Sequence, residues 1–175
     1  MISSAIDLLR ERGVNGVTVD AVLASSGAPR GSVYHHFPGG RSQLVLEAAE
    51  ASAEVMTTMI RSYADVDATT ALQDFAALWK DVLVRSDFRA GCPVAALVNE
   101  TSTDLSGSVD LAGQTFSTWV ELLATTFADD RRTRAEAEDL ALTVVATVEG
   151  AITMCRAQRS VRPLDVAVAQ LIGLL

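Results

Sequence analysis

Residues 18–37, TVDAVLASSGAPRGSVYHHF, contain two short segments separated by a glycine, and this arrangement decides the fold of the N-terminal part. Thr18 is a residue type that caps helix N-termini, and Gly27 ends the helix that Thr18 begins. Pro29 suits the first position of a second helix, which the sequence PGG at residues 38–40 stops after two turns. With a packing helix before them, two short helices joined by a tight glycine turn form a helix-turn-helix.

The rest of the chain also has helical periodicity. Apolar residues recur three or four positions apart through most of the sequence, and no segment alternates as a strand does. Thr70 with Gln73, and Thr133 with Glu136, have the spacing of capping boxes. The expected fold is all-α, with a three-helix head at residues 1–45, a larger helical domain at 46–175 and about nine helices in total.

Composition limits the classes of protein to consider. The chain has 175 residues, of which 49% are hydrophobic, enough for a packed core. It contains no apolar run of about 18 residues and no basic segment followed by an apolar one, so we expect neither a membrane span nor a secretory signal. Cys92 and Cys155 are far apart and match no metal-binding spacing. We therefore expect a cytoplasmic protein with free thiols and neither a metal nor a cofactor.

Charge is distributed unevenly along the chain. The net charge is −8, but residues 1–45 contain four arginines and three carboxylates, a charge of +1, which leaves −9 for residues 46–175. An acidic body with a slightly basic head is compatible with a head that binds phosphates.

The second helix of the helix-turn-helix has one face for the core and another for a partner. Val33 and Phe37 are four residues apart and can both face the core of the head. Arg30 and Tyr34 then project from other sides, and the small residues beside Ser32 let the helix lie deep in a major groove. Arg30 can bind a guanine edge or a phosphate, and Tyr34 can reach a phosphate, although helix-end packing would also explain Tyr34.

The two histidines of the chain, His35 and His36, are adjacent in this helix. Neighbouring helical side chains point about 100° apart, so both rings cannot face one metal ion. This argues against a metal site or an acid–base pair. We expect His35 to lie on the DNA side, whereas for His36 packing or helix capping is as good an explanation.

Residues 13–44 resemble the DNA-binding head of TetR-family transcriptional repressors. That family is marked by Tyr-x-x-Phe at the end of the recognition helix, followed by a short turn and a basic residue, and this sequence has Tyr34, Phe37 and Arg41. The longer turn FPGGR and the later segment RAGCPVAALVNE, residues 89–100, resemble the subgroup around the lincomycin-resistance repressor (the LmrA/YxaF type).

The resemblance implies double-stranded operator DNA as a partner and assigns a set of DNA-facing residues. Arg41 stands where the family usually has lysine, so a phosphate contact with changed geometry is expected there. Family members often carry a basic arm before the first helix, and the printed sequence starts almost directly on that helix. The implied DNA-binding residues are Thr18, Arg30, Ser32, Tyr34, His35, His36 and Arg41.

The resemblance also implies that the helical body holds an effector and forms a homodimer. The apolar and aromatic candidates suit a small hydrophobic or aromatic effector, although without the resemblance the aromatic residues would simply be assigned to the core. The expected pocket residues are Phe75, Trp79, Val82, Cys92, Leu97, Asn99, Phe116, Trp119 and Leu123. Gly150, which is unfavourable inside a helix, suggests a close helix approach, either within the chain or between two copies. The expected dimer interface contains Leu140, Val144, Val148, Gly150, Ala151, Leu164, Val168 and Leu171.

Two functions follow from these patterns. The first is a ligand-responsive repressor that releases a palindromic operator. The second is an all-helical enzyme or small-molecule carrier with a helix-turn-helix-like head. The sequence has no Ser/His/Asp set, phosphate loop or dinucleotide fingerprint. The repressor is favoured because an enzyme has no use for exposed Arg30, Ser32, Tyr34 and His35 with no acid nearby.

Overall fold

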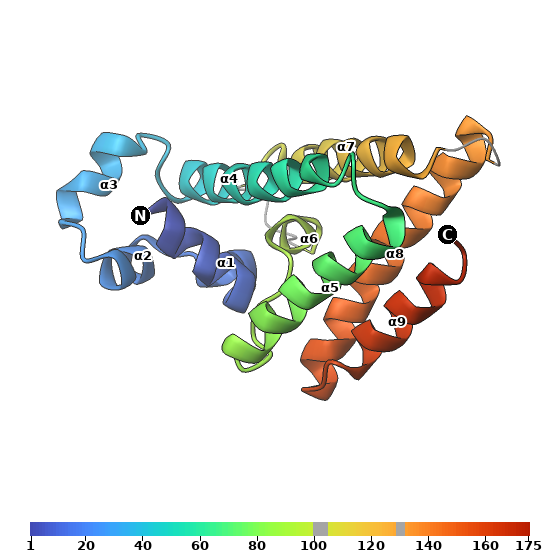
Figure 1. Cartoon of the computed structure of the whole chain (residues 1–175). Helices are drawn as coiled ribbons and strands as arrows, with labels where there is room; N and C mark the ends of the chain where they lie inside the picture. The colour runs from blue at the N-terminus through green and yellow to red at the C-terminus, as the bar shows by residue number, and fades with distance from the viewer. Residues whose placement is uncertain (100–104, 129–131) are drawn as a thin grey trace. The chain divides into compact units, whose positions relative to one another are not determined.

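The computed structural model describes residues 1–99, 105–128 and 132–175, and within these ranges the protein consists of nine α-helices without a strand (Figure 1). The all-α prediction is confirmed. The helices are α1 (Ile2–Gly16), α2 (Val19–Ser26), α3 (Arg30–His36), α4 (Gly40–Ser62), α5 (Ala68–Arg85), α6 (Pro93–Val98), α7 (Ser108–Phe127), α8 (Arg134–Gln158) and α9 (Arg162–Ile172).

The chain folds into two compact units. The first contains Met1–Val55 and Arg89–Gly113, and the second contains Met56–Phe88 and Gln114–Leu175. The first unit therefore extends ten residues past the expected head boundary at residue 45 and includes a later segment with α6. Helices α4 and α7 each begin in the first unit and end in the second.

In the first unit, α1 packs against α2 and α6, and α2 packs against α3. Leu9, Val22 and Val33 from the three head helices are almost completely buried, as is Leu97 of α6. The segment before α6 is tied to α1, because the Gly91 N–H donates to the carbonyl of Arg10 at 2.9 Å. These contacts give the head a continuous apolar core.

The capping residues at the helix-turn-helix match the sequence pattern closely. The hydroxyl of Thr18 accepts a hydrogen bond from the Ala21 N–H at 3.1 Å, which satisfies a free donor at the start of α2. Gly27 ends α2 with a φ of 67°, a left-handed conformation that glycine adopts without steric cost. Pro29 occupies the N-cap of α3, one position earlier than expected.

The second unit is built from α5, α8 and α9, with the ends of α4 and α7. The capping box of Thr133 and Glu136 is confirmed at the start of α8. The capping box expected at Thr70 and Gln73 is wrong, because α5 begins earlier. Asp67 caps α5 by accepting from the Thr70 N–H at 3.0 Å, so α5 begins three residues before the expected start.

Helix α8 is long and apolar enough, by length and composition alone, to cross a membrane. The core helix of a soluble protein meets the same criterion. Here α8 packs against α5 and α9, and seven of its residues are buried in the second unit. This packing accounts for the apolar character of the buried third of its apolar 18-residue stretch.

Candidate nucleic-acid interface and ligand pocket

Helix α3 separates a buried stripe from an exposed face, as its sequence predicts. Val33 is fully buried and Phe37, the residue that follows the helix, is 5% exposed. Arg30 is exposed, and Tyr34 keeps 63% of its surface exposed although it is a large aromatic residue. An exposed aromatic side chain beside an exposed arginine is a surface suited to a partner such as DNA.

An acid does lie next to Arg30, contrary to the expectation from the sequence. A guanidinium nitrogen of Arg30 is 3.4 Å from a carboxylate oxygen of Asp20 in α2, and the two side chains are 84% and 79% exposed. An ion pair this exposed stabilises the fold by little. The guanidinium can therefore leave Asp20 for a base edge or a phosphate at small cost.

The hydroxyl groups of Thr18 and Ser32 both make hydrogen bonds at helix N-termini, but only Thr18 caps its helix. Ser32 is half-buried, and its Oγ donates to the carbonyl of Pro29 at 2.6 Å, within the first turn of α3. Thr18 remains exposed while it caps α2. Each hydroxyl thus has a local bond that positions it at a helix N-terminus, where a phosphate is also favoured.

His35 and His36 are both exposed, and their rings meet edge to face with centroids 5.1 Å apart. The rings are nearly perpendicular, which does not suit shared coordination of an ion. No group of three or more potential metal-ligating side chains occurs among the described residues. Because His36 is exposed, core packing does not account for it.

Arg41 lies in the first turn of α4 and holds the end of α1. Its Nε donates to the carbonyl of Val17 and a terminal nitrogen donates to the carbonyl of Val14, both at 2.8 Å. The side chain is half-buried. Its planar fork thus bridges two carbonyls at the end of α1, of which that of Val14 also accepts the Val17 N–H at 3.1 Å.

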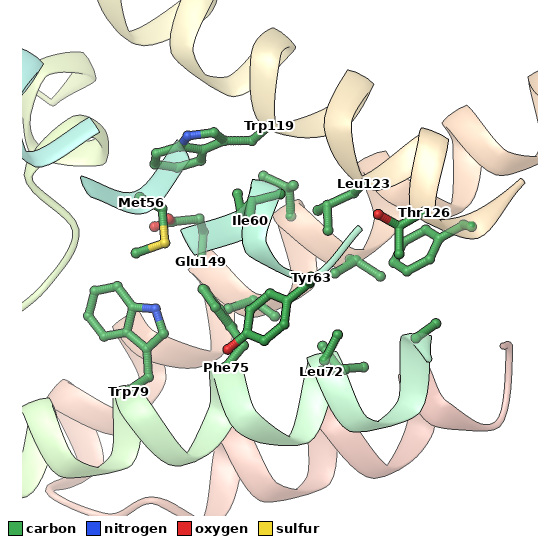
Figure 2. A pocket seen from close by; sticks show the side chains of 16 residues that line it. Met56, Ile60, Tyr63, Leu72, Phe75, Trp79, Trp119, Leu123, Thr126 and Glu149 are labelled. Atoms are coloured by element: carbon green, nitrogen blue, oxygen red, sulfur yellow. The ribbon is translucent and has the colours of Figure 1, made fainter. Parts of the chain in front are cut away.

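The second unit contains an apolar pocket whose empty volume is about 670 Å³ when space open to solvent is included (Figure 2). Side chains from four helices, α4, α5, α7 and α8, line it, together with Tyr63 beyond the end of α4. Phe75 and Trp79 of α5 meet edge to face, with ring centroids 6.5 Å apart. An apolar and aromatic lining of this kind suits a small hydrophobic molecule.

Comparison with known proteins assigns the family. Residues 1–48 match the family of bacterial regulatory proteins named tetR, and residues 68–170 match the C-terminal domain of LmrA/YxaF-like transcriptional regulators. The chain belongs to the TetR family of transcriptional regulators. The resemblance inferred from Tyr34, Phe37 and the FPGGR turn is thereby confirmed, including its subgroup.

Relatives of this TetR-family regulator cover nearly its whole length. It is 38% identical to the uncharacterized HTH-type transcriptional regulator Rv0196 of Mycobacterium tuberculosis, over all of this chain and 92% of the relative. It is 25% identical to the HTH-type transcriptional regulator LmrA of Bacillus subtilis, over 94% of this chain and 88% of that protein. The crystal structure of the regulatory protein TetR from Rhodobacter sphaeroides has the same fold, with a TM-score of 0.85 at 22% identity, covering 97% of this chain and 94% of the other.

Four of the nine residues expected in the regulator's pocket line it, namely Phe75, Trp79, Trp119 and Leu123. Phe116 instead packs edge to face on Trp119, with centroids 5.4 Å apart, and Val82 lies half-buried on α5 outside the lining.

The other three expected pocket residues, Cys92, Leu97 and Asn99, belong to the first unit. Cys92 and Leu97 are buried there, and exposed Asn99 bonds to the carbonyl of Ala95. The segment 89–100 that contains them ends on Glu100, which lies outside the described residues.

The pocket residues predicted from the sequence include none of the lining that comes from α4 and α8. Met56 and Ile60 are four residues apart at the end of α4, a helical spacing that would have indicated a shared face. Val144 and Val148 of α8 had been assigned to the dimer interface. The remaining missed lining residues are Tyr63, Ala68, Ala71, Leu72, Thr126, Phe127, Val145 and Glu149.

Polar groups in the pocket differ in their partners. The Trp119 indole N–H donates to the hydroxyl of Thr57 at 3.0 Å, inside the second unit. Burial, and secondarily the negative charge of Asp74, raises the pKa of Tyr63. Tyr63 therefore remains a neutral phenol at physiological pH and can donate or accept a hydrogen bond.

The residues expected at the dimer interface mostly pack inside the chain. Six of the eight are buried in the single protomer, Leu140 is half-buried and only Gly150 is exposed. Packing of helices within one protomer, the alternative to a dimer interface, therefore explains the burial of six residues: Val144, Val148, Ala151, Leu164, Val168 and Leu171. A Cβ at Gly150 would meet no atom within 4 Å, so a close approach there requires a second molecule.

Proposed function

We propose that this TetR-family regulator is a cytoplasmic repressor that releases a palindromic operator when a neutral hydrophobic molecule occupies the pocket of the second unit. The observation that carries the proposal is the continuity of α4. Its first turn contains Arg41, which holds the end of α1, and its last turns place Met56 and Ile60 in the pocket lining. A ligand that shifts the end of α4 therefore acts on the same rigid element that supports the head.

The DNA-contacting surface is the exposed face of α3 with the N-terminus of α2. Arg30 exchanges its exposed ion pair with Asp20 for a guanine edge. Tyr34, His35 and the N-terminus capped by Thr18 contact phosphates, and His36 and Ser32 lie beside them. Because phosphates of both strands flank the groove, these contacts set the register while Arg30 supplies the sequence preference.

TetR-family regulators dimerise, and the surface of α8 and α9 that stays exposed in the protomer is the proposed interface. Leu142 and Met154 of α8 are 57% and 52% exposed, and Val166 of α9 is 50% exposed. Gly150 lies between the first two along α8 and allows close approach of a partner helix. Pairing of this apolar face with its own copy gives a four-helix interface and two heads for a palindromic site.

A gel shift on the DNA that flanks the protein's own gene tests the repressor proposal. The wild-type protein is expected to shift a fragment with a palindrome at nanomolar to tens of nanomolar concentration in physiological salt. Arg30→Ala is expected to bind that fragment more weakly and with a smaller preference over scrambled DNA of equal length. Equal binding of wild-type protein to palindromic and scrambled DNA would contradict sequence-specific repression and favour the carrier alternative.

A further inference from the structure

The indole N–H of Trp79 is a buried donor in the pocket lining that has no hydrogen-bond partner among the described residues. Trp79 is 4% exposed, and no acceptor in the described part of the chain lies within reach of its Nε1. Figure 2 shows the ring at one end of the lining, with its nitrogen on the edge nearest the other labelled side chains. Buried polar groups in native proteins are nearly always bonded, so an orphan donor that lines a cavity requires an explanation.

A second tryptophan of the same lining, Trp119, has a hydrogen-bonded indole N–H. Trp119 is also 4% exposed, but its Nε1 donates to Thr57. Among the described residues the protein therefore supplies an acceptor for one indole and none for the other, whose residue lines the pocket. Phe75, which packs edge to face on Trp79, provides no acceptor.

Charge in the lining narrows the kind of acceptor that fits. Among the described lining residues, Glu149 alone has a carboxyl group. These lining residues include no lysine, arginine or histidine, so an anionic acceptor such as a carboxylate would lose its hydration there without a cation to pair it. A neutral carbonyl oxygen can accept from the indole N–H without this penalty.

We propose that the pocket selects a flat, neutral, mainly apolar molecule that presents one carbonyl-type oxygen to Nε1 of Trp79. This inference rests on the proposed function of the pocket as the effector site and adds the chemistry by which it selects. The apolar faces of the lining supply most of the affinity, whereas Trp79 discriminates between molecules of the same shape.

Three naphthalene probes of similar size test the proposal by isothermal titration calorimetry. 2-Acetylnaphthalene carries a ketone, 2-isopropylnaphthalene has the same shape without an acceptor, and 2-naphthoate carries a carboxylate. Trp79→Phe keeps an aromatic ring and removes the orphan N–H, so it breaks no hydrogen bond. Trp119→Phe is the matched control, because the N–H it removes is already bonded within the protein.

The measured quantity is the ratio of the ketone's affinity to the hydrocarbon's, compared between proteins. The difference in water solubility of the probes cancels in this comparison. The ratio is expected to be roughly 3- to 10-fold higher in the wild type and in Trp119→Phe than in Trp79→Phe, the usual contribution of one neutral hydrogen bond. Naphthoate is expected to bind wild-type protein more weakly than the ketone.

Nuclear magnetic resonance supplies a second readout if Trp79→Phe fails to fold. The chain has two tryptophans, so ¹⁵N-labelled wild-type protein gives two indole N–H signals, which Trp119→Phe assigns. The ketone is expected to move the Trp79 signal downfield, and the hydrocarbon is not.

The outcomes separate this inference from the proposed function. Equal ratios in wild type and Trp79→Phe, with an unmoved Trp79 indole signal, would overturn the acceptor inference and leave the pocket as a binding site. An equal decrease of the ketone-to-hydrocarbon affinity ratio in Trp79→Phe and Trp119→Phe would also overturn the acceptor inference, because the preference for the ketone would then depend on the shape of the pocket. If none of the probes binds wild-type protein, both the proposal that the pocket is the effector site and the acceptor inference are refuted.

Discussion

Arg41 offers a test that separates a structural role from contact with DNA. The resemblance to the family implies a phosphate contact at this position. In the structure the guanidinium donates to the carbonyls of Val14 and Val17 at 2.8 Å each. We expect Arg41→Ala to loosen the head, because it releases the end of α1 from the start of α4.

The size of the effect follows from those two bonds. A hydrogen bond with a charged partner contributes about 1.5–3 kcal/mol. Arg41 is only half-buried and the Val14 carbonyl keeps its bond from the Val17 N–H, so we take less than the full sum, roughly 2–3 kcal/mol for both bonds. Arg41→Lys retains the charge but not the planar fork, so it should recover about half of the loss.

Hydrogen exchange is the suitable assay, since both tryptophans lie in the second unit and their fluorescence does not report the head. Where exchange follows local opening, a loss of 2–3 kcal/mol speeds exchange of amides at residues 1–48 by about 30- to 160-fold in Arg41→Ala. Salt titration of operator binding supplies the second measurement. Removing one phosphate contact lowers the slope of log affinity against log salt by about 0.9.

The two roles give opposite patterns. A structural role predicts faster exchange in Arg41→Ala and partly in Arg41→Lys, with an unchanged salt slope. Wild-type exchange in both variants, combined with a slope reduced by about 0.9 in Arg41→Ala alone, would refute the argument from the two hydrogen bonds.

Three further changes have defined expected outcomes. Arg30→Ala should weaken binding to the operator by about 1–3 kcal/mol and reduce its preference over scrambled DNA, measured by fluorescence anisotropy; an unchanged preference would contradict base readout. Gly150→Leu should produce a folded monomer in analytical ultracentrifugation, while Gly113→Leu, at another exposed helical glycine with open space around its Cβ, should remain dimeric; a dimeric Gly150→Leu would exclude Gly150 from the interface. Thr133→Ala should destabilise α8 by about 1 kcal/mol through loss of its cap. Hydrogen bonds from Thr133 lower the pKa of Glu136, so their contribution to stability is present above the ordinary pKa of Glu136 and is lost as the pH falls through the lowered pKa of the folded state. Acid titration should therefore reduce the stability of Thr133→Ala less than that of the wild type. An equal reduction in the two proteins would contradict the capping box of Thr133 and Glu136.

Local signals in the sequence predicted the head well. Thr18 and Gly27 have preferred roles at helix ends, and these roles depend on neighbours within a few residues. The predicted start of α5 was wrong because Asp67 and Thr70 are both favourable N-cap residues. The apolar stripe that should distinguish them begins with alanines, which are only weakly hydrophobic.

The pocket and the dimer surface were harder to predict because both depend on contacts between distant segments. Helical periodicity shows that Val144 and Val148 face something apolar, but it does not distinguish the chain's own core from a partner. Both residues line the pocket. The sequence pattern did not single out Leu142 and Met154. Their exposure in the folded protomer, beside buried residues of the same helix, identifies them as an apolar face that a partner could cover.

The most direct test of the account is the affinity of a pocket ligand with and without saturating operator DNA. The best-binding naphthalene probe would be titrated into wild-type protein by calorimetry, alone and then with an excess of the palindromic fragment. Reciprocal coupling between the pocket and the head predicts that the DNA weakens probe binding by roughly 5- to 150-fold. Equal affinity in the two titrations would contradict the claim that the pocket controls the head.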